Sequence, residues 1–181
     1  EEGVNNVVGM YIMRTKKGTL FLADTTINLD PTAEEIADMS ILIAKKVKQF
    51  RIKPRIALLS YSNFGSTRTK DSEKMAKAAA ILKEENPNLV VDGEIQGDFA
   101  LDTEKMQRIF PFSPLAEKSA NTLIFPNLSS GNMAYKLIQE IAEVAKKYKL
   151  IILSDEIYSQ LTFNNKYKSI SNFYPEGTIV S

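Results

Sequence analysis

Short apolar runs recur along this chain, and a polar loop and then a helical pattern follow each of them. The clearest unit covers residues 55–68, where an apolar run at 56–59 predicts a buried strand and a loop rich in Ser, Asn, Gly and Thr leads to a helix at about 71–85. Further strands are predicted at 89–91 and 122–125. Strands that alternate with helices form a mostly parallel sheet with right-handed crossovers. The sequence therefore predicts an α/β fold, a three-layer sandwich.

The beginning of the chain predicts a hairpin that precedes this alternation. Residues 7–14 and 20–25 have the pattern of two strands, and Lys16, Lys17 and Gly18 between them are typical of a turn. An amphipathic helix then opens near Asp30 or Thr32, either of which can cap it, and it ends in several lysines. We expect the hairpin and the units that follow to form one α/β domain over residues 1–181.

Composition excludes several functional classes. The 181 residues are 44% hydrophobic and carry a net charge of +1 with both signs interleaved, which argues against a nucleic-acid or membrane-surface partner. No apolar run approaches the ~20 residues that span a bilayer, so we expect a cytoplasmic protein. The chain has no Cys and no His, which excludes a Cys nucleophile, a Ser-His-Asp triad and most zinc sites.

The loop after the strand at 56–59 is the first candidate site. A helix that follows such a loop presents unpaired backbone N–H groups and the positive end of its dipole, which suit a phosphate or carboxylate. The alternative is that the hydroxyl groups only cap the helix and close the turn. The candidate anion ligands are Ser60, Ser62, Asn63, Gly65, Ser66, Thr67 and Arg68.

Two further polar loops are expected at the same edge of the sheet, because ligands bind where parallel strands end. Residues 92–98 include Asp92, Glu94 and Asp98, which could perform acid–base chemistry or hold Mg²⁺, or could form an ordinary solvated loop. We predict no metal site there. The loop at 126–132 precedes a long helix.

Five segments in order resemble the phosphate acetyl/butyryltransferase family. The resemblance runs over roughly residues 6–139, and Asn63-Phe64 is similar to the version fused to the carboxyl end of bacterial malic enzymes, where the transferases usually carry Thr-Lys. The similar segments are 23–26, 30–35, 59–66, 91–96, and 120–127 followed by 131–136.

This resemblance implies a cleft for acyl-CoA or phosphate, and in the malic enzyme version a regulatory module that senses acetyl-CoA. It also implies a possible homodimer. The arginine-bearing catalytic segments of the transferases are not found in this sequence, so we expect no catalytic activity and assign no catalytic residue. The implied ligand-binding residues are Ser60, Ser62, Asn63, Gly65, Ser66, Asp92, Glu94, Asn127 and Asn132, with Arg68 as the nearby cation.

From about residue 140 to 181 the sequence resembles a segment of class I pyridoxal-phosphate aminotransferases. Residues 155–158 resemble that family's Asp-Glu-Ile-Tyr motif, which implies cofactor contacts from Asp155 and Tyr158. The family's lysine-bearing segment and phosphate loop are missing, so we expect no pyridoxal phosphate and no other cofactor. The alternative is that Asp155 is a strand-end carboxylate and Tyr158 a half-buried aromatic.

The change of resemblance falls inside one helical pattern, near residues 137–141. Residues 150–153 and 178–180 then predict two more strands, and we expect the first to complete the sheet. Three functions follow from this reading. The first is a truncated, inactive acyl-CoA or phosphate-binding domain. The alternative is a natural or designed chimera with a purely structural role, and a pyridoxal-phosphate aminotransferase fragment is the least favoured.

Overall fold

The computed structural model describes residues 7–15, 18–148, 152–154 and 178–180. They fall into two compact units, one formed by Glu1–Arg14 with Gly18–Tyr135 and the other by Thr15–Lys17 with Lys136–Ser181. Because the two units are described separately, the prediction of one domain over residues 1–181 stays a prediction.

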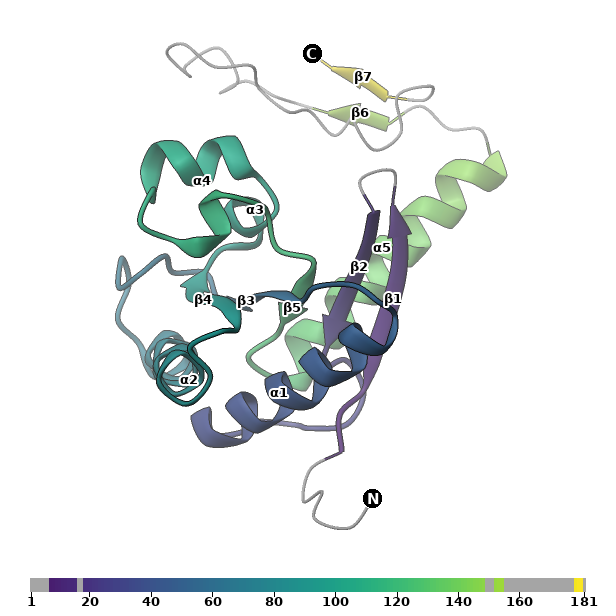
Figure 1. Cartoon of the computed structure of the whole chain (residues 1–181). Helices are drawn as coiled ribbons and strands as arrows, with labels where there is room; N and C mark the ends of the chain where they lie inside the picture. The colour runs from purple at the N-terminus through teal and green to yellow at the C-terminus, as the bar shows by residue number, and fades with distance from the viewer. Residues whose placement is uncertain (1–6, 16–17, 149–151, 155–177, 181) are drawn as a thin grey trace. The chain divides into compact units, whose positions relative to one another are not determined.

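A five-stranded sheet forms the centre of the first unit (Figure 1). Its order is β1-β2-β5-β3-β4, and β2, β5, β3 and β4 are parallel. Strand β1 lies beside β2 and its arrow points the opposite way, which confirms the N-terminal hairpin (Figure 1). The strands are β1 (Met10–Thr15), β2 (Gly18–Ala23), β3 (Arg55–Leu59), β4 (Val90–Ile95) and β5 (Thr122–Ile124).

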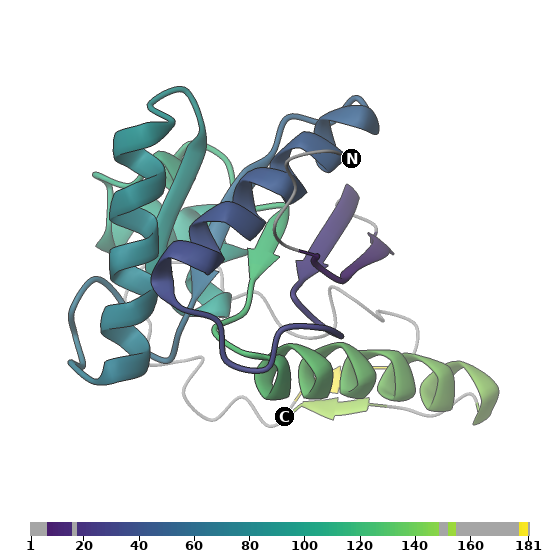
Figure 2. The same ribbon diagram turned by 90° about the horizontal axis from the view of Figure 1, so that it is seen from below.

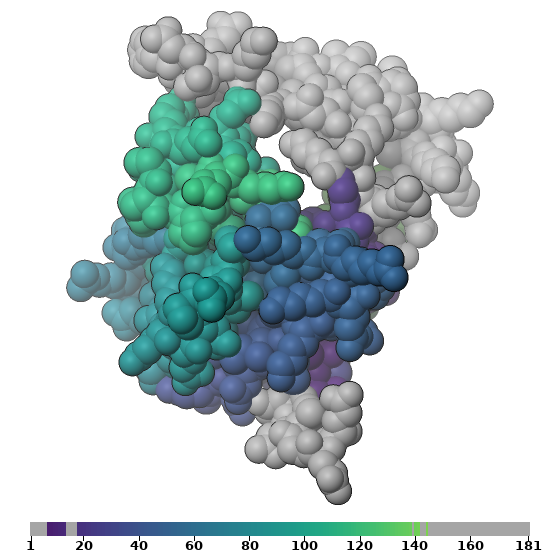
Figure 3. Space-filling model, viewed as in Figure 1, coloured from purple at the N-terminus to yellow at the C-terminus, as the bar shows by residue number. Residues whose placement is uncertain are grey.

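Helices cover both faces of this sheet, so the predicted three layers are confirmed. One face packs against α1 (Ala33–Gln49) and α2 (Lys70–Glu85), which lie side by side in Figure 2 and form a continuous blue and teal surface in Figure 3. The other face packs against α3, α4, a 3₁₀ turn and the start of α5. These elements are α3 (Gly97–Ala100), α4 (Thr103–Ile109), η1 (Pro114–Ala116) and α5 (Leu128–Tyr148).

Thr32, rather than Asp30, caps α1. Its hydroxyl oxygen accepts from the Glu35 backbone N–H at 3.2 Å, and the Glu35 carboxylate accepts from the Thr32 N–H at 2.7 Å. This reciprocal pair satisfies two backbone donors that the first turn leaves unpaired. Asp30 instead forms an ion pair with Lys74 of α2 at 2.5 Å. Local hydrogen bonds therefore fix where the first crossover helix begins.

Strand β4 extends beyond the predicted limit of residue 91, so Asp92 and Glu94 lie in the strand and not in a loop after it. The pairing with β3 shifts register, because Leu58 lies opposite Gly93 and Leu59 lies opposite Ile95. Glu94 is therefore the extra residue of a β-bulge, which turns its side chain away from the regular alternation. Gly93 has φ 152°, and a Cβ there would lie 2.7 Å from the Leu58 oxygen.

In the second unit, β6 (Ile152–Ser154) pairs in parallel with β7 (Thr178–Val180) as a separate two-stranded sheet. The two predicted strands are confirmed, but the expectation that the first completes the main sheet is wrong, because its described partner is β7. Asp155 and Tyr158 lie outside the described residues. In the part of the chain that the structure describes, no helix combines the length and apolarity needed to cross a membrane.

We expect Leu82→Ala to lower the free energy of unfolding by about 2–5 kcal/mol, because it leaves a cavity between α2 and the sheet. Leu82 is 0% exposed and belongs to the core on that face. Urea unfolding measures the change. Glu84→Ala, an exposed position on the same helix, is the control and should change it by less than about 0.5 kcal/mol. Equal effects of the two variants would contradict the assignment of this core.

Candidate functional site

The carboxyl ends of β2, β3, β4 and β5 lie at one edge of the sheet, because these strands are parallel. This carboxyl edge consists of the segments that follow the four strands: residues 24–28, 60–67, 96–98 and 125–132. Ligands of open α/β sheets bind at such an edge. The predicted loops are therefore brought to one side of the first unit, as the sequence indicated.

Glu94 fastens the loop at residues 60–67 to the end of β4. Its Oε1 accepts from the Ser62 hydroxyl at 2.8 Å and from the Gly65 N–H at 2.5 Å, and its backbone oxygen accepts from the Phe64 N–H at 2.9 Å. Ser62 is 0% and Glu94 3% exposed. Hydrogen bonds to a carboxylate are stronger than those between neutral groups. The bulge residue thus organises the loop.

Other polar groups of this loop also pair with one another. The Ser66 hydroxyl oxygen accepts from the Asn63 N–H at 2.9 Å, and the Ser62 hydroxyl oxygen accepts from the Thr67 N–H at 3.0 Å. The Ser60 hydroxyl oxygen accepts from the Ser62 N–H at 3.2 Å. A ligand at these groups would compete with existing hydrogen bonds. Ligand binding by Ser60, Ser62, Asn63, Gly65 and Ser66 stays a prediction.

Asn63 and Gln96 join this loop to the segment after β4. The Asn63 Oδ1 accepts from the Gln96 N–H at 2.8 Å, and the Gln96 side-chain amide donates to the Tyr61 backbone oxygen at 2.7 Å. Gln96 was not among the predicted site residues. Its place directly after a strand was the sequence feature that could have indicated it.

Arg68 lies between this loop and α2, and its side chain is exposed. Thr69 caps the helix, since its hydroxyl oxygen accepts from the Ser72 N–H at 3.3 Å. Among the described residues Arg68 forms no ion pair. A guanidinium group beside the carboxyl edge is suited to an anionic ligand.

The three predicted carboxylates do not converge. Asp92 is 0% exposed, and its Oδ1 accepts from the Lys83 ammonium at 2.5 Å and from the Gly93 N–H at 3.0 Å. Glu94 holds the loop, and Asp98 pairs with Lys105. The prediction that they meet in one loop is wrong because Asp92 and Glu94 belong to β4. Within the described residues, no group of three or more acidic side chains could hold a metal ion.

Asp24 has the densest hydrogen bonding at this edge, and sequence reasoning did not select it as a site residue. It is 2% exposed, its Oδ1 accepts from the N–H groups of Gly9, Thr26 and Ile27, and its Oδ2 accepts from the Asn28 N–H. An acidic residue directly after a buried strand was the available indication. Its carboxylate shapes the turn after β2, so its role is structural.

The first turn of α5 packs against the turn after β2. Asn127 Oδ1 accepts from the Ser130 N–H at 3.0 Å, and the Asn132 side-chain amide donates to the Thr25 backbone oxygen at 3.1 Å. Gly131 permits this approach, because a Cβ there would lie 2.2 Å from the Asp24 backbone oxygen. Asn127 and Asn132 thus lie at the predicted edge with structural partners, and their contact with a ligand stays a prediction.

Two polar atoms in the described part of the chain are buried without a hydrogen-bond partner, the Thr25 hydroxyl oxygen and Asp92 Oδ2. Thr25 follows β2 at the carboxyl edge, whereas Asp92 lies within β4. Elsewhere, burial lowers the pKa of Arg55, whose Nε donates to the Ser119 oxygen at 2.6 Å. Arg55 begins β3, so it belongs to the opposite, amino edge and not to the candidate site.

This geometry defines the first unit as an α/β domain with a polar carboxyl edge. The model of the family "Phosphate acetyl/butaryl transferase" matches residues 1–148, and the chain belongs to this family. The match continues past the predicted junction near residue 140. The aminotransferase resemblance of residues 140–181 and the chimera gain no support from this match and stay predictions.

Relatives of two kinds are similar to this chain. An NADP-dependent malic enzyme of Haemophilus influenzae is 40% identical over 139 residues, which are 77% of this chain and 18% of that protein. A phosphate acetyltransferase of Bacillus subtilis is 37% identical over 141 residues, 78% of this chain and 43% of that protein. The chain therefore spans less than half the length of these relatives.

Two solved phosphotransacetylase structures are also similar to this chain. A phosphotransacetylase from Streptococcus pyogenes superposes with a TM-score of 0.70 at 35% identity, over 78% of this chain and 44% of that one. The EutD phosphotransacetylase from Staphylococcus aureus gives a TM-score of 0.71 at 28% identity, with the same coverage of both chains. The fold is therefore that of part of a phosphotransacetylase.

We expect Glu94→Ala to lower the free energy of unfolding by about 2–4 kcal/mol, because the Ser62 hydroxyl and the Gly65 N–H both lose a buried acceptor. Glu94→Gln keeps an oxygen at this place and should cost about half as much. Urea unfolding of both variants gives the comparison. If the alanine variant is no less stable than the glutamine variant, the carboxylate does not hold this loop.

Gly131→Ala should destabilise the chain by about 1–3 kcal/mol, because the new methyl group overlaps the Asp24 backbone oxygen. Gly97→Ala is the matched control, since a Cβ at Gly97 meets nothing within 4 Å. Thermal unfolding of the two variants measures the difference. Equal midpoints would show that α5 and the turn after β2 do not pack as closely as described.

Proposed function

We propose that this chain is an acyl-CoA or phosphate-binding domain of the regulatory kind, which binds its ligand at the carboxyl edge and does not carry out acyl transfer. Family membership and the similarity to both malic enzymes and phosphate acetyltransferases support a ligand of this class. The 40% identity to a malic enzyme favours the regulatory kind over the transferase.

The observation that carries the proposal is the position of Arg68. Its exposed side chain stands beside the loop at residues 60–67 without an acidic partner in the described part of the chain. A phosphate group or the phosphates of a CoA ester would supply that partner. The exposed Ser66 and Thr67 lie next to it in the chain.

Acyl transfer has further requirements at the carboxyl edge. Acyl transfer to phosphate brings two anionic reactants together, which requires several positioned cations. Arg68 is the arginine that the described residues place at this edge, and its neighbours Ser62 and Gly65 donate to Glu94. The alternative, a recombined protein with a purely structural role, has no observation in its favour. A homodimer remains a further prediction of the family resemblance.

We expect acetyl-CoA to raise the midpoint of thermal unfolding by several degrees at ~100 times its dissociation constant, which corresponds to about 2.7 kcal/mol. Phosphate alone should raise it less, because it offers fewer contacts. Arg68→Gln should reduce the acetyl-CoA shift, whereas Lys118→Gln, at another exposed cation, should leave it unchanged.

An assay for acetyl phosphate formation from acetyl-CoA and phosphate completes this experiment. Binding without product is the expected result. Product formation would contradict the regulatory role, and a cooperative unfolding transition that neither ligand moves would contradict binding itself.

A further inference from the structure

Four phenylalanine rings meet beside the loop at residues 60–67. Phe64 comes from this loop, Phe99 from α3, and Phe110 and Phe112 from the segment that follows α4. The Phe64 ring centroid lies 4.9 Å from that of Phe110 and 5.0 Å from that of Phe112, and the centroids of Phe99 and Phe110 are 5.2 Å apart. Tilted and edge-to-face contacts at such distances are favourable for aromatic pairs. These four rings, the aromatic cluster, all belong to the first unit.

Folding accounts for three of the four rings but not for Phe112. Phe64, Phe99 and Phe110 are half-buried and pack against the core on this face of the sheet. Phe112 is 69% exposed and is not part of that core, and its ring contacts those of Phe64 and Phe110. A large apolar side chain that stays mostly in water adds little to the stability of the folded chain. The ring of Phe112 is therefore available for contact with another molecule.

The loop at residues 60–67 fixes the position of Phe64 in the aromatic cluster. The φ angle of Phe64 is 48°, in the left-handed region that is unfavourable for a residue with a Cβ. Its N–H donates to the Glu94 backbone oxygen at 2.9 Å, and the Glu94 carboxylate accepts from the next residue, Gly65. Unfavourable backbone conformations of this kind persist where surrounding contacts hold them, often at binding sites. The contacts that shape the loop therefore also position the cluster.

The charged groups near the aromatic cluster differ on its two sides. The Lys105 ammonium lies 4.2 Å from the centroid of the Phe99 ring and pairs with Asp98, so this ring already has a partner. Arg68 follows Phe64 by four residues, is exposed and forms no ion pair among the described residues. A matching ligand has a flat ring system for Phe112 and phosphate groups for Arg68. The nucleotide part of an acyl-CoA has both, whereas free phosphate has no ring.

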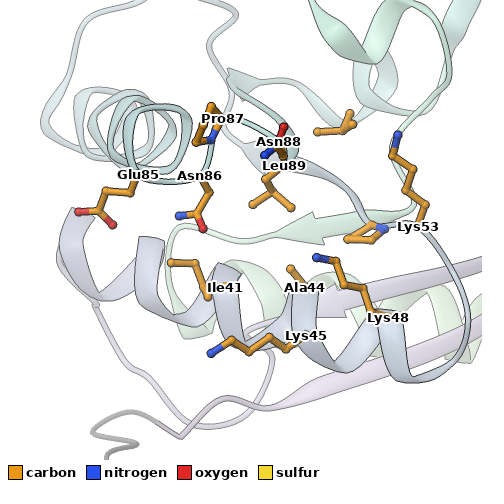
Figure 4. A pocket seen from close by; sticks show the side chains of 12 residues that line it. Ile41, Ala44, Lys45, Lys48, Lys53, Glu85, Asn86, Pro87, Asn88 and Leu89 are labelled. Atoms are coloured by element: carbon orange, nitrogen blue, oxygen red, sulfur yellow. The ribbon is translucent and has the colours of Figure 1, made fainter.

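The pocket at the opposite, amino edge offers no such ring. It has a volume of about 460 Å³ and lies between the ends of α1 and α2 and the segments that precede β3 and β4 (Figure 4). Its lining is mainly aliphatic or amide-bearing, and the ammonium groups of Lys45, Lys48 and Lys53 point to different sides (Figure 4). A ligand with a flat ring and phosphates therefore matches the carboxyl edge better than this pocket.

We propose that the aromatic cluster binds the adenine ring of an acyl-CoA, which stacks on Phe112 while Arg68 holds the phosphates. This inference rests on the proposed function and adds to it the place of the nucleotide half of the ligand. Stacking of a base on an aromatic side chain is a common source of affinity for nucleotides. Phe112 is thus the residue that favours acyl-CoA over ligands without a ring.

The first test uses the absence of tryptophan from this sequence. Phe112→Trp introduces one tryptophan into the aromatic cluster, so its fluorescence reports on this position alone. We expect acetyl-CoA and ADP to quench this fluorescence, because adenine stacks on the indole ring. S-acetylpantetheine, which has the acyl arm and no nucleotide, should leave it unchanged. Phe50→Trp, at a half-exposed phenylalanine after α1, is the matched control and should respond to none of the three.

Calorimetric titration then measures the contribution of the ring to affinity. Phe112→Leu should weaken acetyl-CoA binding about fivefold or more, which is the size of the loss when one aromatic stacking partner of a base is removed. Phe112→Tyr keeps an aromatic ring and should bind acetyl-CoA like the original chain. All Phe112 variants should unfold at the same temperature as the original chain, because this side chain is exposed.

The outcomes separate this inference from the proposed function. If acetyl-CoA stabilises the chain but neither quenches the introduced tryptophan nor distinguishes Phe112→Leu, the adenine site is wrong and the proposed function stands. If acetyl-CoA neither stabilises nor quenches, both are wrong. Quenching by S-acetylpantetheine alone would assign the cluster to the acyl arm. Quenching that rises with protein concentration in the absence of ligand would assign it to a contact between two copies, and either result overturns the adenine site.

Discussion

One buried carboxylate, that of Glu94, connects the two polar segments on which the carboxyl edge depends. It belongs to β4, yet the groups that it binds belong to the loop after β3. A buried carboxylate is costly unless donors compensate it, and the Ser62 hydroxyl and the Gly65 N–H supply those hydrogen bonds. The two donors are themselves satisfied by the same carboxylate. The loop conformation and the end of the strand therefore stabilise each other.

The sequence predicted the elements that local chemistry determines. The helix α2 was expected at about residues 71–85 and spans Lys70–Glu85. Thr32 caps α1 because its capping partner Glu35 is three residues away. The role of Glu94 was not predictable in this way. It depends on the register between β3 and β4, which apolar periodicity does not reveal. The predicted residues of the loop after β3 therefore lie at the carboxyl edge, but with partners that only the tertiary structure defines.

The two edges of the sheet satisfy their polar groups differently. At the carboxyl edge, carboxylates such as Asp24 and Glu94 accept hydrogen bonds from the turns around them, so most of the polarity is internal. At the amino edge, the exposed side chains include Lys45, Lys48 and Lys53, which form no ion pair among the described residues. A shared fold does not fix function, and the relatives of this chain include two kinds of enzyme. Its chemistry must therefore be read from these edges.

The bulge in β4 makes this part of the chain sensitive to the insertion or deletion of a residue. Glu94 is the one residue by which β4 exceeds β3 between the pairs Leu58–Gly93 and Leu59–Ile95. Deleting Glu94 would restore a regular ladder, in which Ile95 would directly follow Gly93 and remain opposite Leu59. The sheet itself would lose little by such a deletion, whereas the loop after β3 would lose its acceptor. At this point of the fold, an insertion or deletion is a more severe change than many substitutions.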